Sequence, residues 1–96
     1  MSVIVTLEAD IKAGQKEKLL GMLRDYLPET KVYAGFISIS IHTQQNSNHI
    51  LFFEEWEKVE NYESYLGWRT QSGVMDTLGA TFVEVPKITY YNTEEM

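Results

Sequence analysis

Several side chains that could carry out proton transfer lie close together in the second half of the chain. Glu54 and Trp56 end an apolar segment that begins at Ile50, and Tyr62 and Tyr65 follow shortly after them. A carboxylate becomes a general base near neutral pH when burial raises its pKa, and a tyrosine hydroxyl can orient a substrate oxygen. Glu54, Trp56 and Tyr62 are therefore the candidate residues of a pocket at this corner between a strand and a helix.

The aromatic residues of this segment also have a purely structural interpretation. Trp56 could be a core residue that packs between a sheet and a helix and donates its indole N–H to a carbonyl. Tyr62 and Tyr65 face nearly the same way on a helix, so they could instead cover a small core. Both interpretations stay open, since the pattern of Trp56 fits a pocket wall and a core equally well.

The charged candidates have alternatives of the same kind. Glu54 could form a salt bridge at the sheet edge with Lys58 or Arg69, an interpretation that the low specificity of a single carboxylate favours. Arg69 is the only cation between Lys58 and Lys87, so it could bind an enolate or a substrate carboxylate. The alternative for Arg69 is an arginine on the solvated side of a helix.

Two strands on either side of a polar loop supply the remaining candidates. Residues 36–43 alternate between two faces, one made of three isoleucines and the other of Phe36, Ser38, Ser40 and His42. The small serine side chains leave room for a ligand above the second face. The candidate substrate-binding residues are Phe36, His42, Phe52, Tyr65 and Arg69.

The histidines do not predict a metal site. His42 and His49 flank the polar loop, but two ligands without nearby carboxylates are too few for zinc. The chain has no cysteine, which excludes disulfides and thiolate ligands and fits a reducing compartment. The sequence contains no glycine-rich phosphate loop and no nucleophile elbow. We therefore expect neither a metal nor a cofactor.

The composition is that of one small globular domain. The chain has 96 residues and a formal net charge of −6, from 8 basic and 14 acidic side chains. This charge argues against binding to nucleic acid or to an anionic membrane surface, which both need a basic footprint. The sequence shows no signal peptide and no membrane-spanning segment, so we expect a cytoplasmic protein. A core this small is often completed by association, which predicts a homodimer.

Apolar periodicity predicts one domain that spans residues 1–96. Pro28 is expected to end the first helix, and the second is expected to continue to Leu78 after a break near Gly67 or Gly73. The order β-α-β-β-α-β is that of a ferredoxin-like α+β fold, an antiparallel four-stranded sheet with both helices on one face. The predicted elements are strand Ser2–Asp10, helix Gln15–Leu27, strands Phe36–Thr43 and His49–Trp56, helix Val59–Trp68 and strand Lys87–Asn92.

The chain resembles the antibiotic biosynthesis monooxygenase family of dimeric α/β-barrel proteins over nearly its whole length. The resemblance lies in IKAGQKEKLLGML, AGFISISIH, ILFFEEWEKVENYESYL and VPKITYY, with Glu54 and Trp56 forming an E-x-W pair that Tyr62 follows. The resemblance implies a dimer with a pocket in each subunit. In active members it also implies oxidation of a phenolic or quinol-like substrate by O2 without metal or flavin. Trp56 and Tyr62 occupy the places of a tryptophan and a tyrosine that take part in the quinone-forming members.

Some positions depart from the family pattern. Members often carry a histidine where this chain has Tyr65, and a second one near Thr70. The haem-degrading relatives use an asparagine at the position of Leu7 and a histidine on the second helix, whereas no histidine follows Trp56 here. Without an imidazole there is no axial ligand for haem iron, so haem degradation is disfavoured.

Two functions are compatible with these observations. The first is a cofactor-independent monooxygenase that oxidises a quinol or polycyclic phenol with O2, which the pair Trp56 and Tyr62 supports. The alternative is a non-catalytic dimeric module of the same fold that binds aromatic ligands or acts in a stress response, which the missing histidines support. Oxygen uptake in the presence of an aromatic substrate distinguishes the two.

Overall fold

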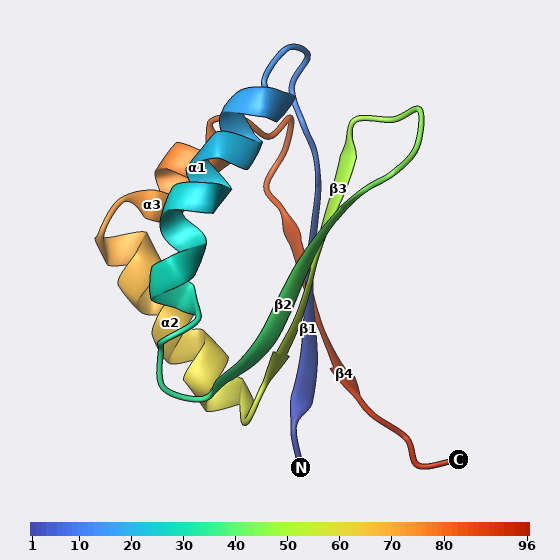
Figure 1. The fold of residues 1–96 in the computed structure, drawn as a ribbon, viewed down its shortest axis with the longest axis vertical. Coiled ribbons are helices and arrows are strands. Elements are labelled where there is room, and N and C mark those ends of the chain that lie inside the picture. The colour runs from blue at the N-terminus through green and yellow to red at the C-terminus, as the bar shows by residue number, and fades with distance from the viewer.

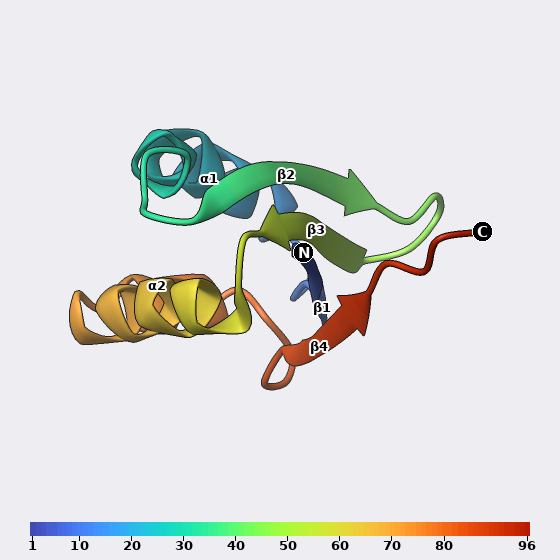
Figure 2. The same cartoon turned by 90° about the horizontal axis from the view of Figure 1, so that it is seen from below.

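A computed structural model describes residues 1–96 and shows a four-stranded antiparallel sheet in the order β2-β3-β1-β4. The helices cover one face of the sheet, and the other face carries no second layer (Figure 1 and Figure 2). The predicted ferredoxin-like fold is confirmed, with the last helical segment divided in two. The elements are β1 Val3–Asp10, α1 Lys16–Thr30, β2 Phe36–Thr43, β3 His49–Trp56, α2 Val59–Gln71, α3 Val74–Gly79 and β4 Lys87–Asn92.

The two central strands place the core between the sheet and the helices. Strand β1 lies between β3 and β4, and its alternating residues Val3, Val5, Leu7 and Ala9 are all buried. Strand β3 presents its own alternating set to the same side. That buried set on β3 consists of Ile50, Phe52, Glu54 and Trp56.

Helix α1 is longer than predicted, because it continues through Pro28 and ends at Thr30. A proline inside a helix removes its own N–H donor and crowds the carbonyl four residues earlier, yet the backbone bonds resume after Pro28, with Lys31 donating to the carbonyl of Leu27 at 3.0 Å. The extra turn brings Thr30 into the interior, where its side chain bonds to residues of α2. The expectation that Pro28 ends the helix is therefore wrong.

A β-bulge at the start of β2 changes which residues share a face. The register with β3 shifts between Phe36 and Ser38, since Phe36 pairs with Trp56 and Ser38 pairs with the adjacent Glu55. Phe36 thereby joins the helix side, where its ring meets that of Trp56 edge-on at 5.5 Å. The prediction that Phe36 shares a face with Ser38 and His42 is wrong for this reason.

The break between the last two helices lies at Gly73, one of the two predicted positions. Helix α2 ends at Gln71, and Gly73 has φ +83°, a left-handed conformation that glycine adopts without strain. The short helix α3 follows and buries Leu78 against the core. An isolated antiparallel β-bridge pairs Ile11, the residue after β1, with Phe82 in the loop that follows α3.

The open face of the sheet carries both apolar and charged side chains. Phe53 and Tyr91 are 43% and 49% exposed there, and the buried hydroxyl of Thr6 has no hydrogen-bond partner. At one end, the ring of His49 lies between the carboxylates of Glu8 at 3.0 Å and Asp10 at 2.9 Å, which raise its pKa. No helix in the protein has the length and apolar character that crossing a membrane requires.

Candidate functional site

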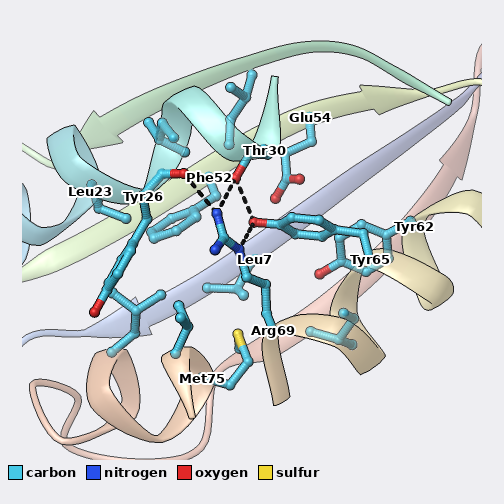
Figure 3. A pocket seen from close by; sticks show the side chains of 15 residues that line it. Leu7, Leu23, Tyr26, Thr30, Phe52, Glu54, Tyr62, Tyr65, Arg69 and Met75 are labelled. Carbon is cyan, nitrogen blue, oxygen red and sulfur yellow. Dashed lines mark hydrogen bonds between the residues drawn. The ribbon is translucent and has the colours of Figure 1, made fainter. Parts of the chain in front are cut away.

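A small cavity lies between the sheet and the helices and has a volume of about 30 Å³. Strands β1, β2 and β3 form its floor, α1 forms one wall, and α2 with α3 forms the other (Figure 3). Twelve of its 15 lining residues are hydrophobic, and the three others are Thr30, Glu54 and Arg69. Three of the hydrophobic residues are tyrosines and also carry a hydroxyl group, namely Tyr26, Tyr62 and Tyr65.

Glu54 is the carboxylate of this cavity. Its place in the alternation of β3 turns it toward the helices, and its side chain points into the space between them (Figure 3). The residue is only 3% exposed, and one carboxylate oxygen, Oε1, accepts a hydrogen bond of 3.0 Å from the indole Nε1 of Trp56. Burial raises the pKa of Glu54 to about 7, although the indole hydrogen bond lowers it.

No cation compensates the charge of Glu54. The salt bridges of the protein join His49 to Glu8 and Asp10, and Arg69 to Glu29. The alternative that Glu54 is a sheet-edge carboxylate paired with Lys58 or Arg69 is therefore wrong. A carboxyl group in this environment is close to half ionised at neutral pH, which is the condition that suits a general base.

Trp56 lies beside the cavity and does not line it. Its side chain is fully buried among aromatic rings, with ring centres 5.1 Å from Tyr65, 5.5 Å from Phe36 and 5.7 Å from Tyr62. The indole N–H donates to the carboxylate of Glu54 and not to a carbonyl. Trp56 thus fixes the orientation of Glu54 and packs behind Tyr62 and Tyr65, which line the cavity.

Tyr62 supplies a hydroxyl that stays protonated. The side chain is 1% exposed and lines the cavity. Burial raises the pKa of Tyr62, and the nearby charge of Glu54 raises it further, so the hydroxyl remains a hydrogen-bond donor at all physiological pH values. The structure shows no hydrogen-bond partner for this hydroxyl, which leaves its donor free for a ligand.

Arg69 joins the two walls of the cavity. Its Nη2 donates to the carbonyl of Tyr26 at 2.7 Å and to the hydroxyl of Thr30 at 3.1 Å, and its Nε donates to the hydroxyl of Tyr65 at 3.1 Å (Figure 3). The guanidinium also lies 4.2 Å from the ring centre of Trp68. Arg69 is 2% exposed, so the alternative of a solvated helix arginine is wrong.

The hydroxyl of Tyr65 completes this network, because it bonds to Thr30 at 2.7 Å as well as to Arg69. Replacing Tyr65 by Phe should lower the free energy of unfolding by about 2 kcal/mol, since a buried hydrogen bond to a charged group is lost. Urea denaturation measures this change. Tyr26→Phe is the control, because it removes a hydroxyl that has no hydrogen-bond partner and keeps the carbonyl that Arg69 uses, and an equal loss in both variants would contradict the structural role of Tyr65.

The structure does not bring every predicted residue to the cavity. Phe52, Tyr65 and Arg69 line it, whereas Phe36 packs behind Trp56. His42 lies on the open face of the sheet, where it is exposed and its Nε2 bonds to the hydroxyl of Ser40 at 2.8 Å. No group of three or more His, Asp or Glu side chains is arranged to hold a metal ion.

Sequence reasoning missed the contribution of α1 to the cavity. Tyr26 and Thr30 bond to Arg69, but their partner is more than 35 residues away in the chain. The predicted end of the helix at Leu27 also placed Thr30 outside any element. The apolar spacing of α1 could have indicated Tyr26 as a core residue, whereas no local pattern indicates the role of Thr30.

The cavity is too small for an aromatic ring in this conformation. A volume of about 30 Å³ has room for roughly two water molecules, whereas an engineered cavity that binds benzene measures about 150 Å³. Drug-sized ligands occupy pockets of about 300–1,000 Å³. A flat aromatic molecule therefore reaches Glu54 only if lining side chains move.

Comparison with known proteins agrees with the fold. The family described as antibiotic biosynthesis monooxygenase matches residues 2–75. A conserved protein from Methanosarcina mazei Go1 is similar with a TM-score of 0.87 and 14% identity, over 98% of this chain and 94% of that one. The monooxygenase ActVA-Orf6 of Streptomyces coelicolor, in complex with the ligand nanaomycin D, has a TM-score of 0.82 and 15% identity, over 99% and 89%. No curated protein sequence matches the chain.

Proposed function

Because the chain belongs to the antibiotic biosynthesis monooxygenase family, we propose that it oxidises a quinol or polycyclic phenol with O2, without a metal or flavin. The observation that carries this proposal is Glu54, a buried carboxyl group with a pKa of about 7 in an otherwise apolar cavity. Such a group can take a proton from a weakly acidic carbon or phenol and return it later. The bound nanaomycin D of the Streptomyces coelicolor monooxygenase supports a small-molecule site in this fold.

The reaction is illustrated by an anthrone, whose methylene carbon becomes the carbonyl of a quinone. Glu54 removes one proton from this carbon, and the resulting anion transfers electrons to O2 and forms a carbon–oxygen bond. The proton on Glu54 returns to the peroxide, and Glu54 then removes the second proton as the O–O bond breaks. One oxygen atom remains as the new carbonyl. The other leaves as hydroxide and takes the second proton from Glu54 to become water, so that O2 gains the four electrons that the carbon loses and Glu54 is ionised again.

Three further residues would support these steps. Tyr62 donates its free hydroxyl to the oxygen on which the negative charge of the substrate develops. Arg69 adds a positive charge on the same side of the cavity, at a position that its bonds to Tyr26 and Thr30 fix. Trp56 acts as a positioning residue, because its indole N–H holds one oxygen of Glu54 and leaves the other for the substrate.

One observation favours the non-catalytic alternative. The hydroxyl of Tyr65 and the Nη2 of Arg69 are both bonded to α1, so these groups already have partners within the protein. A module that only binds flat aromatics would show saturable quenching of tryptophan fluorescence without oxygen uptake. The test of the enzyme is conversion of a dihydroxyanthrone in air and under nitrogen, and product formation under nitrogen would contradict the proposal.

We also propose a homodimer that is formed through the open face of the sheet. A hollow of about 400 Å³ lies on this face and is lined by Ile4, Thr6, Glu8, Leu51, Phe53 and Tyr91. A second copy of the chain would cover the exposed rings of Phe53 and Tyr91 and complete a second layer of structure.

The dimer should give a light-scattering mass of two chains at micromolar concentration. Phe53→Arg places a charge at the centre of the apolar part of this face and is expected to give the mass of one chain. Val32→Arg is the matched control, because Val32 is 84% exposed in the turn after α1 and should leave the mass unchanged. A single-chain mass for the unaltered protein would contradict the dimer.

A further inference from the structure

The cavity that contains Glu54 shares a wall with a much larger open groove. The groove has a volume of about 610 Å³ and runs between α3 and residues 82–88, the loop and first residues of β4. Leu66 and Met75 line both the cavity and the groove. These two side chains therefore lie in the wall between the cavity and the groove.

Met75 is the side chain in this wall that can move most easily. It lies in the first turn of α3, is only partly buried, and projects toward the cavity beside Arg69 (Figure 3). Methionine is unbranched and has several rotatable bonds, so it changes its shape at low energetic cost. A rotation of Met75 away from Arg69 would join the cavity of about 30 Å³ to the groove.

The groove has the surface character of an aromatic subsite. Most of its exposed surface is apolar, and Val83 and Val85 at its rim are 59% and 92% exposed. Phe82 and Ile88 also contribute to its lining. A flat polycyclic molecule could place its reacting ring beside Glu54 and leave its remaining rings between α3 and the loop, where apolar walls would cover them.

We propose that aromatic ligands reach Glu54 through this groove, that the side chain of Met75 is the gate, and that part of the bound ligand stays in the groove. Only the choice of a flat aromatic ligand rests on the proposed function. The path itself follows from the two hollows and the wall that they share.

The opposite wall offers a rival path. A hollow of about 190 Å³ beside α1 and β2 shares Leu23 and Leu27 with the cavity. Leu23 is 4% exposed and belongs to the main hydrophobic core, so its displacement would disturb packing that stabilises the fold. Met75 packs against the same core but is only partly buried, so its rotation disturbs that packing less than displacement of Leu23 would.

Gly79 allows the groove to be blocked without a change to the cavity. It lines the groove at the end of α3, and a Cβ added there has no neighbour within 4 Å. Gly79→Phe should fill part of the groove and slow the association of naphthoquinone, followed by stopped-flow quenching of tryptophan fluorescence, by about tenfold. Gly21→Phe is the matched control, because Gly21 lies on α1, is equally free of neighbours and lines neither hollow.

A second variant acts in the opposite direction. Met75→Ala shortens the gate and should speed the association of naphthoquinone by about fivefold or more. Leu27→Ala tests the rival path on the other wall. Faster association in Leu27→Ala with unchanged rates in Gly79→Phe and Met75→Ala would overturn the proposal, as would a wild-type protein that naphthoquinone does not quench.

These binding measurements separate the path from the chemistry. Association rates that follow the predicted order in a protein without oxygen uptake would support the gate and contradict the monooxygenase. If the protein takes up oxygen but naphthoquinone associates with Gly79→Phe and Met75→Ala as fast as with the wild type, the monooxygenase would be supported and the gate overturned.

Discussion

Glu54→Gln is expected to raise the free energy of unfolding by about 3 kcal/mol at about pH 8, because the folded protein holds a carboxylate where burial disfavours charge. The pKa of Glu54 is raised from an ordinary 4.5 to about 7 in the folded state. The folded protein therefore binds the proton more tightly than the unfolded chain, and its stability falls as pH rises from 4.5 to about 7. Above that pH the loss is complete and constant. Glutamine carries no charge and keeps an oxygen that accepts the N–H of Trp56.

Urea denaturation of the wild type and the variant at several pH values measures this effect. The difference in stability should be close to zero near pH 4.5, where Glu54 is protonated in the folded state, and should grow up to about pH 8. The pKa of His49 is also raised, so its titration changes the stability with pH. This change is the same in both proteins and cancels in the difference between them. Glu57→Gln, at an exposed position, is the control, and a pH-independent difference for Glu54→Gln would contradict the assignment.

The same substitution is expected to lower the rate of aromatic oxidation by about 10² to 10⁴-fold, the usual contribution of a positioned general base. A base acts in its ionised form, so the wild-type rate should rise with pH through the pKa of about 7 and then level off. In Glu54→Gln this rise should disappear. Initial rates of quinone formation from a dihydroxyanthrone, corrected for autoxidation at each pH, give the profile.

Two outcomes of that experiment would contradict a base at position 54. One is an unchanged rate in Glu54→Gln, and the other is a rise near pH 7 that survives the substitution. Glu57→Gln again serves as the control and should retain both the rate and the profile. Together, the two expected effects describe a residue that weakens the fold in its ionised form and is retained for chemistry.

The sequence was sufficient to predict the sheet. Residues two apart in a strand lie on the same face, so Glu54 and Trp56 could be grouped on one face in advance, whereas the apolar run Ile50–Phe53 does not show which face is buried. The position of the helix break could also be narrowed to Gly67 or Gly73, because glycine is the residue that adopts a left-handed conformation most easily. These predictions depend on local patterns alone.

Other features depend on contacts between distant residues and could not be predicted. The continuation of α1 past Pro28 is accompanied by the bonds of Thr30 to Tyr65 and Arg69, which no local rule reveals. The bulge after Phe36 moves that ring to the helix side, although its alternation with Ser38 indicated the opposite face. The partner of Glu54 is the indole of Trp56 and not a cation, because Arg69 is bonded to α1.

The size of the cavity is a further property that only the structure supplies. The sequence indicated an aromatic-lined pocket at the end of β3, and the aromatic rings do gather there. They fill the space with one another, however, since Trp56 packs against Tyr62, Tyr65 and Phe36. What remains is a cavity of about 30 Å³ that a substrate can enter only after side chains have moved.

The most direct test of the proposed function is oxygen uptake by the purified protein with a dihydroxyanthrone, recorded beside the amount of quinone formed. A monooxygenase of this kind should consume one O2 for each quinone, at a rate above autoxidation that is lost in Glu54→Gln. An uptake equal to autoxidation, together with saturable fluorescence quenching by the same compound, would contradict the enzyme and identify a binding module.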